Sequence, residues 1–193
     1  MCEDHYRQLT LKIAASDEQA FDDLFRSLYA RLVRFSCNYT MDNEPAADIV
    51  QQAFIKLWQK RKQLNPEQSV KSYMYRIVRN LSLNYIRDNA MIVHTIDFED
   101  VYSDGQENSF SQQNETLEDK SSQMLLLEEW IISLPERQKD ALTLSKFEGL
   151  NHEEIADIMQ VSKNTVNNHI VSAMKNIKKL HDKYLQKAKA GYA

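Results

Sequence analysis

Apolar residues recur at helical spacing over the first ninety positions. From Phe21 to Phe35 they return every three or four residues, which predicts a helix with one buried face. Just before them, Ser16 and Gln19 match the S-x-x-Q capping box and place the helix start there. Two more helices are predicted, at about 45–61 and 69–88.

This periodicity disappears over residues 91–121 and then returns. The aperiodic stretch carries a net charge of −7, so we predict an interdomain linker. Beyond it, Pro135 and Glu136 open a predicted helix, Gly149 closes it, and two shorter helices follow. We therefore predict an all-α protein with two small helical domains, 1–90 and 122–193, joined by the acidic linker 91–121.

The composition agrees with a helical protein, and the distribution of charge suggests a polyanionic binding partner. Three glycines and three prolines in 193 residues are too few for a turn-rich β-sandwich or a glycine-loop nucleotide enzyme. The net charge of −4 selects no partner, but residues 56–90 and 163–193 each carry +6, whereas 122–162 carry −5. Two basic blocks suggest two contacts with a nucleic acid, although two solvated helix faces explain them equally well.

No catalytic or cofactor-binding pattern occurs in the sequence. The five histidines are scattered, the two cysteines form no CxxC pair, and no P-loop or HExxH motif is present. The longest aliphatic run is too short to span a bilayer, and the charged N-terminus lacks the apolar segment of an export signal. We expect a cytoplasmic protein that is not an enzyme and uses no cofactor, metal or small-molecule substrate.

Residues 151–177 have the pattern of a helix-turn-helix. Asn151 and Glu154 predict a capped first helix, and the turn follows at 160–162. In the second helix, the apolar residues at positions 166, 170, 173 and 177 share one narrow arc. The opposite side of residues 163–177 carries no carboxylate, which DNA would repel. An ordinary amphipathic helix pair is the alternative. The candidate DNA-binding residues are Asn164, Thr165, Asn168, Ser172 and Lys175.

The predicted helix 69–88 combines arginines with tyrosines. Arginines bind phosphates and exposed aromatic rings stack on unpaired bases, so this helix suits single-stranded or melting DNA. An exposed arginine face with tyrosines in the core explains the same pattern. The candidates are Arg76, Arg79, Asn80, Leu83 and Arg87 on one arc, with Tyr73, Tyr75 and Tyr85 interleaved.

The predicted helix 45–61 has an unusual outer face. It carries Asp48, Gln51, Gln52 and Gln59 around a single apolar residue, Ile55. This face is suited to a protein contact, although scattered exposed apolar residues are normal on protein surfaces.

Three segments in this order resemble a bacterial RNA polymerase sigma factor, in the extracytoplasmic-function (ECF) group of the sigma-70 family. They are DIVQQAFIKLWQKR from Asp48, VKSYMYRIVRNLSLNYIRD from Val70, and LPERQKDALTLSKFEGLNHEEIADIMQVSKNTVNNHIVSAMKNIKKL from Leu134. The resemblance covers about residues 17–90 and 122–182. It implies sigma regions 2 and 4 joined by a linker. It also implies an alternative sigma factor that binds core polymerase, recognises promoters and helps to melt the DNA.

The resemblance also implies partners and residue roles. Residues 73–87 match the helix that meets and melts the −10 element, loop 62–69 would hold an extruded base, and 163–175, including Lys163, match the helix that reads the −35 element. The implied partners are core polymerase through its β′ clamp helices and β flap, promoter DNA and an anti-sigma factor. The residues that match the clamp-docking helix are Asp48, Gln51, Gln52, Ile55 and Trp58.

Three positions depart from the family pattern, and two rival functions remain at this level. Gln160 stands where the family often has glycine, and a left-handed backbone there would cost roughly 1 kcal/mol. Val70 and Tyr73 stand where the −10 helix commonly has Phe and Trp. A one-component regulator with an N-terminal sensor, or a helical adaptor protein, would share parts of this pattern. A sigma factor should bind duplex DNA weakly when free, because its acidic segments oppose its basic helices and its two DNA-reading domains are masked or misoriented without polymerase.

Overall fold

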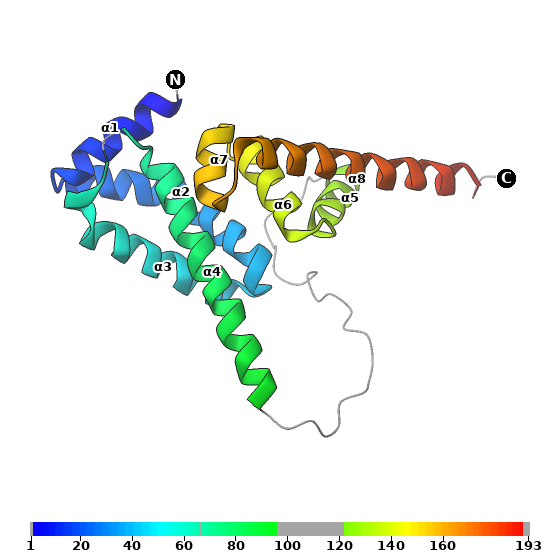
Figure 1. The fold of residues 1–193 in the computed structure, drawn as a ribbon, viewed down its shortest axis with the longest axis horizontal. Helices are drawn as coiled ribbons and strands as arrows, with labels where there is room; N and C mark the ends of the chain where they lie inside the picture. Colours follow the sequence, from blue (N-terminus) through cyan, green and yellow to red (C-terminus); the bar gives the residue numbers. More distant parts are fainter. Residues whose placement is uncertain (1, 66, 96–121, 191–193) are drawn as a thin grey trace.

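The computed structural model describes residues 2–65, 67–95 and 122–190, and all regular structure in these ranges is helical (Figure 1). Most of the predicted linker, from residue 96 to 121, lies outside the described residues. The N-terminal domain consists of α1 (Cys2–Ala14), α2 (Glu18–Thr40), α3 (Asn43–Gln59), the 3-10 turn η1 (Arg61–Gln63) and α4 (Val70–Thr95). The C-terminal domain consists of α5 (Ser122–Ile132), α6 (Glu136–Leu142), the π-helical turn η2 (Thr143–Phe147), α7 (His152–Met159) and α8 (Lys163–Ala190).

The apolar faces predicted for the N-terminal helices form its core. Helices α2, α3 and α4 pack on one another through side chains such as Leu28, Val50 and Met74, all of which are fully buried. Helix α1, which the sequence analysis did not predict, closes one side of this bundle with Leu9 and Ile13. Removing these side chains from water is the main stabilising term for the domain.

Three predicted helix ends are corrected by the structure. Helix α2 is capped by the side chain of Asp17, which accepts the N–H of Ala20, and not by Ser16, which adopts φ 67°. Helix α4 continues past residue 88 to Thr95. The last helix is not short, because α8 runs without a break for 28 residues.

The helix-turn-helix is formed by α7 and α8, as the sequence predicted. Gly149 ends the preceding turn with φ +66°, and Asn151 and Glu154 make a reciprocal capping box at the start of α7. Gln160 closes α7 in the left-handed conformation expected for it, with φ 55°. The apolar arc of α8 packs inward, with Val166, Ile170 and Ala173 buried and Ile177 half-buried.

The two domains pack against each other, with α7 lying along the first half of α4 (Figure 1). Apolar side chains of both domains belong to one continuous cluster, in which Tyr75 and Ile155 are members from opposite sides. Helix α8 leads away from the N-terminal bundle towards the C-terminus (Figure 1). The interface therefore covers part of α4, while the C-terminal part of α8 extends away from it (Figure 1).

Candidate functional site

The predicted recognition face of α8 is open to solvent. Lys163, Asn164, Asn168 and Lys175 are exposed, and the other two candidates, Thr165 and Ser172, are half-buried. The first turn of the helix is ordered by Ser162, whose hydroxyl oxygen accepts the backbone N–H of Thr165 at 3.1 Å. The Lys163 ammonium pairs with the carboxylate of Glu153 on α7. The amide, hydroxyl and ammonium groups on the rest of this face can hydrogen-bond base edges and phosphates.

The outer face of α3 is also exposed, as its pattern predicted. Ile55 is 56% exposed and is flanked by the polar side chains of Asp48, Gln51 and Gln52. Trp58 differs from these four, because it is half-buried, with its ring 5.0 Å from that of Phe21. A hollow of about 320 Å³ lies beside this face, lined in part by Asp48 and Gln52.

The predicted −10 residues of α4 are not all on the surface. Asn80 and Arg87 are exposed, and Tyr73, Arg76 and Leu83 are half-buried. Two expected positions are corrected: Tyr75 is fully buried, and Arg79 is only 5% exposed. The Tyr75 ring packs edge-on against Phe35, with 5.2 Å between centroids, so it is a core side chain here and not an exposed stacking platform.

Arg79 is buried by an ion pair that crosses between the domains. Its Nε donates to Oδ2 of Asp140 on α6 at 2.9 Å, and the Tyr39 hydroxyl donates to the other carboxylate oxygen at 2.5 Å. Asp140 is only 1% exposed. Both partners found for this carboxylate thus belong to the N-terminal domain.

Four further contacts between the domains join polar or basic groups to carboxylates. Arg31 pairs with Glu148 at 2.7 Å, and the Lys71 ammonium lies 3.7 Å from the same carboxylate. Nearer the middle of α4, Arg76 pairs with Asp157 of α7 at 2.9 Å. The hydroxyl of Ser72 donates to the carboxylate of Glu154 at 2.5 Å. The basic side of α4 is therefore matched by carboxylates of the C-terminal domain.

Burial perturbs the ionisation of the groups in this interface. Burial raises the pKa of the Asp140 carboxyl, while the bonds from Tyr39 and Arg79 oppose that shift. Burial, reinforced by the charge of Asp140, raises the pKa of Tyr39. Burial also lowers the pKa of Lys71, against the attraction of Glu148. These groups occupy a water-poor site in which each charge depends on its partner.

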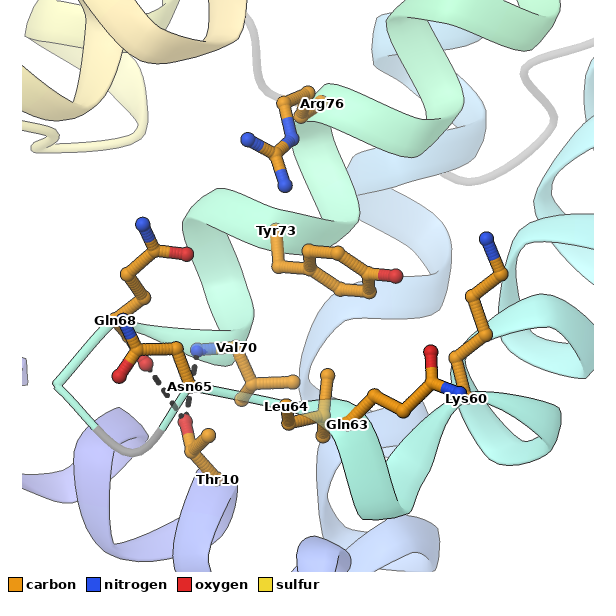
Figure 2. A pocket seen from close by; sticks show the side chains of 9 residues that line it. All are labelled: Thr10, Lys60, Gln63, Leu64, Asn65, Gln68, Val70, Tyr73 and Arg76. Atoms are coloured by element: carbon orange, nitrogen blue, oxygen red, sulfur yellow. Dashed lines mark hydrogen bonds between the residues drawn. The ribbon is translucent and has the colours of Figure 1, made fainter.

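A hollow of about 210 Å³ lies at the start of α4, next to the 62–69 loop (Figure 2). The ring of Tyr73 lies along one side of it, and Arg76 stands beyond the ring. Thr10 holds the loop, because its hydroxyl oxygen lies 3.1 Å from the carbonyl of Gln68 and accepts the N–H of Val70 at 3.0 Å. An aromatic ring, several amides and a guanidinium around one small hollow suit a nucleobase next to a phosphate.

Sequence reasoning did not find Thr10 or the carboxylates that meet α4. The only signal for the carboxylates was the net charge of −5 over residues 122–162. Among the residues that the structure describes, no group of three His, Cys, Asp or Glu is arranged to hold a metal ion. Within the same residues, no helix is long and apolar enough to cross a membrane.

Comparison with known proteins matches both domains to one family. The family model for sigma-70 region 2 matches residues 24–91, and the model for sigma-70 region 4 matches residues 124–177. The RNA polymerase sigma-H factor of Pseudomonas aeruginosa is 28% identical over 193 residues, which cover 94% of this chain and 96% of that protein. The ECF RNA polymerase sigma-E factor of Escherichia coli K12 is 29% identical over 175 residues, covering 88% of this chain and 90% of that protein.

Solved structures share the fold at lower identity. CnrH, in complex with the cytosolic domain of CnrY, has a TM-score of 0.64 and 16% identity, covering 92% of this chain and 97% of CnrH. The sigma factor RpoE of Bartonella quintana, in complex with the anti-sigma factor NepR, has a TM-score of 0.67 and 18% identity, and the match covers 84% of this chain and 96% of RpoE. With two models of one family matching in order over more than half of the chain, and with sigma factors aligning along most of its length, the chain belongs to the ECF group of the sigma-70 family and is a transcription initiation factor.

Proposed function

We propose that this sigma factor reads the −35 promoter element with the exposed face of α8. The observation that carries the proposal is the exposed arc of Asn164, Asn168 and Lys175, which has no carboxylate between residues 163 and 175 and lies opposite a buried apolar arc. A helix of this kind enters the major groove with one side reading bases and the other supported by its domain. In vitro transcription with purified core polymerase on a promoter library is the direct test of the overall function.

Reading and anchoring on α8 should be separable. Asn168 lies mid-helix and can form paired hydrogen bonds with an adenine edge, so Asn168→Ala should relax the preference at one position by ~1–3 kcal/mol. Lys175 lies further along, so Lys175→Ala should weaken binding to all sequences similarly. Selection from a −35 library decides between them. The assignment fails if Asn168→Ala leaves every base preference intact, or if Lys175→Ala changes preference and not overall strength.

The −10 role is assigned to the outer part of α4 and to the adjacent hollow. The extruded non-template base would enter the hollow beside Tyr73, where amides of the 62–69 loop can hydrogen-bond its edge. Arg76, Asn80, Leu83 and Arg87 would follow the unpaired strand along the helix. The support is the joint presence of an aromatic ring, amides and a guanidinium around one opening (Figure 2).

Removing one arginine tests the melting role. Arg76→Ala should impair promoter opening more than closed-complex formation, and it should flatten the salt dependence of DNA binding by about one unit of slope. Permanganate footprinting of the transcription bubble measures opening. Arg26→Ala is the matched control, because Arg26 is an exposed arginine on α2 outside this face. Normal opening in Arg76→Ala would remove this arginine from the melting role.

The outer face of α3 is the proposed binding site for core polymerase. The side chains there, centred on Ile55, would dock on the β′ clamp helices, with Trp58 at the end of the contact. Gln52→Ala combined with Ile55→Glu should abolish core binding and leave the helix folded, because a carboxylate in a buried apolar contact is costly. Leu11→Glu places the same charge on an exposed leucine of α1 as a control. Retention of core polymerase in a pull-down with the double variant would refute this face.

The remaining assigned partners are the β flap for the C-terminal domain and an anti-sigma factor. The similar RpoE protein from Bartonella quintana was solved with an anti-sigma factor bound, which supports the second of these. A purified candidate should bind this chain and reduce transcription in vitro until excess chain restores it. Tight, sequence-specific binding of the free chain to duplex DNA would instead favour a one-component regulator.

A further inference from the structure

The N-terminal helix α1 borders the hollow to which the proposed function assigns an extruded base. Thr10 of α1 lines this hollow together with Tyr73 and Arg76 of α4 (Figure 2). The match to the region 2 family model begins at residue 24, so α1 lies before it. Helix α1 is nevertheless fixed in place, because Leu9 and Ile13 are buried in the core of the domain.

The Thr10 hydroxyl holds the end of the loop at which α4 begins. It accepts the buried N–H of Val70 at 3.0 Å, and it lies 3.1 Å from the carbonyl oxygen of Gln68 (Figure 2). The first N–H groups of a helix have no partner within the helix, so Thr10 supplies a cap to α4 from another helix. Val70 and Tyr73 are three residues apart and share one side of α4, so the bond that fixes Val70 also fixes the backbone that carries the Tyr73 ring.

A second hydroxyl holds the other end of the same loop. Ser16, in the turn after α1, accepts the Nε–H of Arg61 in η1 at 2.9 Å. The Arg61 guanidinium also donates to the carbonyl of Trp58 at 2.7 Å and lies 4.3 Å from the centroid of that ring. Ser16 has φ 67°, a conformation that a residue other than glycine keeps only where its surroundings hold it. The segment of α1 and its following turn therefore ties down both Arg61 and Val70.

These two ties act on the side chains that form the hollow. The loop residues that line it are Gln63, Leu64, Asn65 and Gln68. Thr10 itself is only 1% exposed, so it offers a base almost no surface and acts through the loop and α4. A hollow that is formed before the base arrives loses less conformational entropy on binding than a loop that must order around each base. A fixed shape also rejects the wrong base more strongly than a loop that can adapt.

We propose that Thr10 is a positioning residue for −10 recognition, whose hydroxyl fixes the shape of the base hollow, and that Ser16 supports the other end of the loop. The N-terminal helix thereby takes part in base selection without binding the base. This inference rests on the proposed −10 role of the hollow.

Promoter selection with core polymerase and the full chain tests the proposal. A library with every base at each −10 position, in which each promoter has its own barcode in the transcript, is transcribed in one reaction. Sequencing of the transcripts gives the base preference at each position. A loss of folded protein lowers transcription from all promoters alike and leaves these ratios unchanged. Tyr73→Leu removes the ring from the hollow and identifies the position at which the base is captured.

The variants separate the hydroxyl of Thr10 from its bulk and from general stability. Thr10→Val keeps the shape of the side chain and removes the hydroxyl, whereas Thr10→Ser keeps the hydroxyl and removes the methyl group. Ser16→Ala removes the other tie at a half-buried position, and keeps the test open if Thr10→Val does not fold. The matched control is Ser36→Ala, which breaks a buried 2.9 Å hydroxyl pair with Ser82 between α2 and α4, away from the residues that line the hollow. Far-UV circular dichroism checks the fold of each variant.

We expect Thr10→Val to lower the preference for the best base at the captured position at least about threefold, because a lost hydrogen bond of this kind has a modest but measurable effect. Thr10→Ser should keep most of that preference, Ser16→Ala should lose less of it than Thr10→Val, and Ser36→Ala should change no ratio. Unchanged ratios in Thr10→Val, with or without a uniform loss of transcription, would overturn the positioning role and leave the hollow as the −10 site. An equal loss of preference in Thr10→Ser would overturn the hydroxyl as its cause. If Tyr73→Leu alters no preference, the assigned hollow fails and the positioning role fails with it.

Discussion

Replacing Gln160 with glycine should stabilise the C-terminal domain, because the turn between α7 and α8 requires a left-handed backbone. Gln160 has φ 55° and ψ 48°, and the N–H of the next residue, Val161, donates back to the carbonyl of Ala156 at 3.0 Å, which holds this conformation. Left-handed backbone costs an L-residue about 1–2 kcal/mol and costs glycine almost nothing. The side chain of Gln160 is exposed, so its removal sacrifices little packing.

The size of the effect follows from two opposing terms. Glycine has more conformational entropy in the unfolded chain, and this offsets about 0.5–1 kcal/mol of the stability gained by relieving the strain. We therefore expect Gln160→Gly to raise the free energy of unfolding by roughly 0.5–1 kcal/mol, or a few degrees in Tm for a domain of this size. Gly149→Ala is the reverse experiment, because Gly149 has φ +66° and an added Cβ would meet nothing within 4 Å. Gly149→Ala should lower the free energy of unfolding by a similar amount, because the added Cβ strains the backbone without causing a clash.

Urea unfolding followed by far-UV circular dichroism measures both changes, with an unaltered denaturant slope as the sign that only stability has moved. Gln160→Ala is the control, because it shortens the side chain but keeps the Cβ that causes the strain. It should stay within about 0.5 kcal/mol of the wild type. If Gln160→Gly does not raise the free energy of unfolding, or if Gln160→Ala raises it as much, backbone strain at the turn does not limit stability.

Two further predictions concern groups that hold the N-terminal domain. Tyr39 and Tyr75 should remain protonated while exposed tyrosines ionise, because burial raises the pKa of both hydroxyls above the ordinary value of 10.0. Their contribution to stability is therefore complete below pH 10 and is lost as pH rises further. The near-ultraviolet absorbance of tyrosinate should show two late groups in the wild type and one in Tyr39→Phe, and ionisation of all tyrosines in a single early step would contradict this. Thr10→Val should cost about 1–3 kcal/mol in urea unfolding, because it leaves the buried N–H of Val70 without its acceptor, whereas Thr10→Ser should retain most of the stability. A loss in Thr10→Ser with none in Thr10→Val would mean that the methyl group, not the hydroxyl, matters at this position.

The sequence by itself determined the helix-turn-helix and the main helices other than α1, because the information for these is local. Apolar spacing fixed which faces of α2, α3 and α8 are buried, and side chains at the helix ends set the caps of α7. The left-handed backbone at Gln160 was expected on a different ground, because the resembled family often has glycine at this position. The same spacing predicted the solvent-exposed faces of α3 and α8, because each of these faces lies opposite an apolar arc.

Only the tertiary structure decided what covers α4. Tyr75 lies between the apolar and basic arcs of that helix, so its burial depends on Phe35 and on the second domain and not on its own spacing. The acceptor for Arg79 comes from a residue 61 positions away, and the Tyr39 hydroxyl reaches the same carboxylate across 101 positions. Charge counts showed that acidic and basic blocks exist, but a charge alone does not select its partner. That selection is made by the packing of the C-terminal domain on α4, which brings Asp140 of α6 to Arg79 and removes both from water.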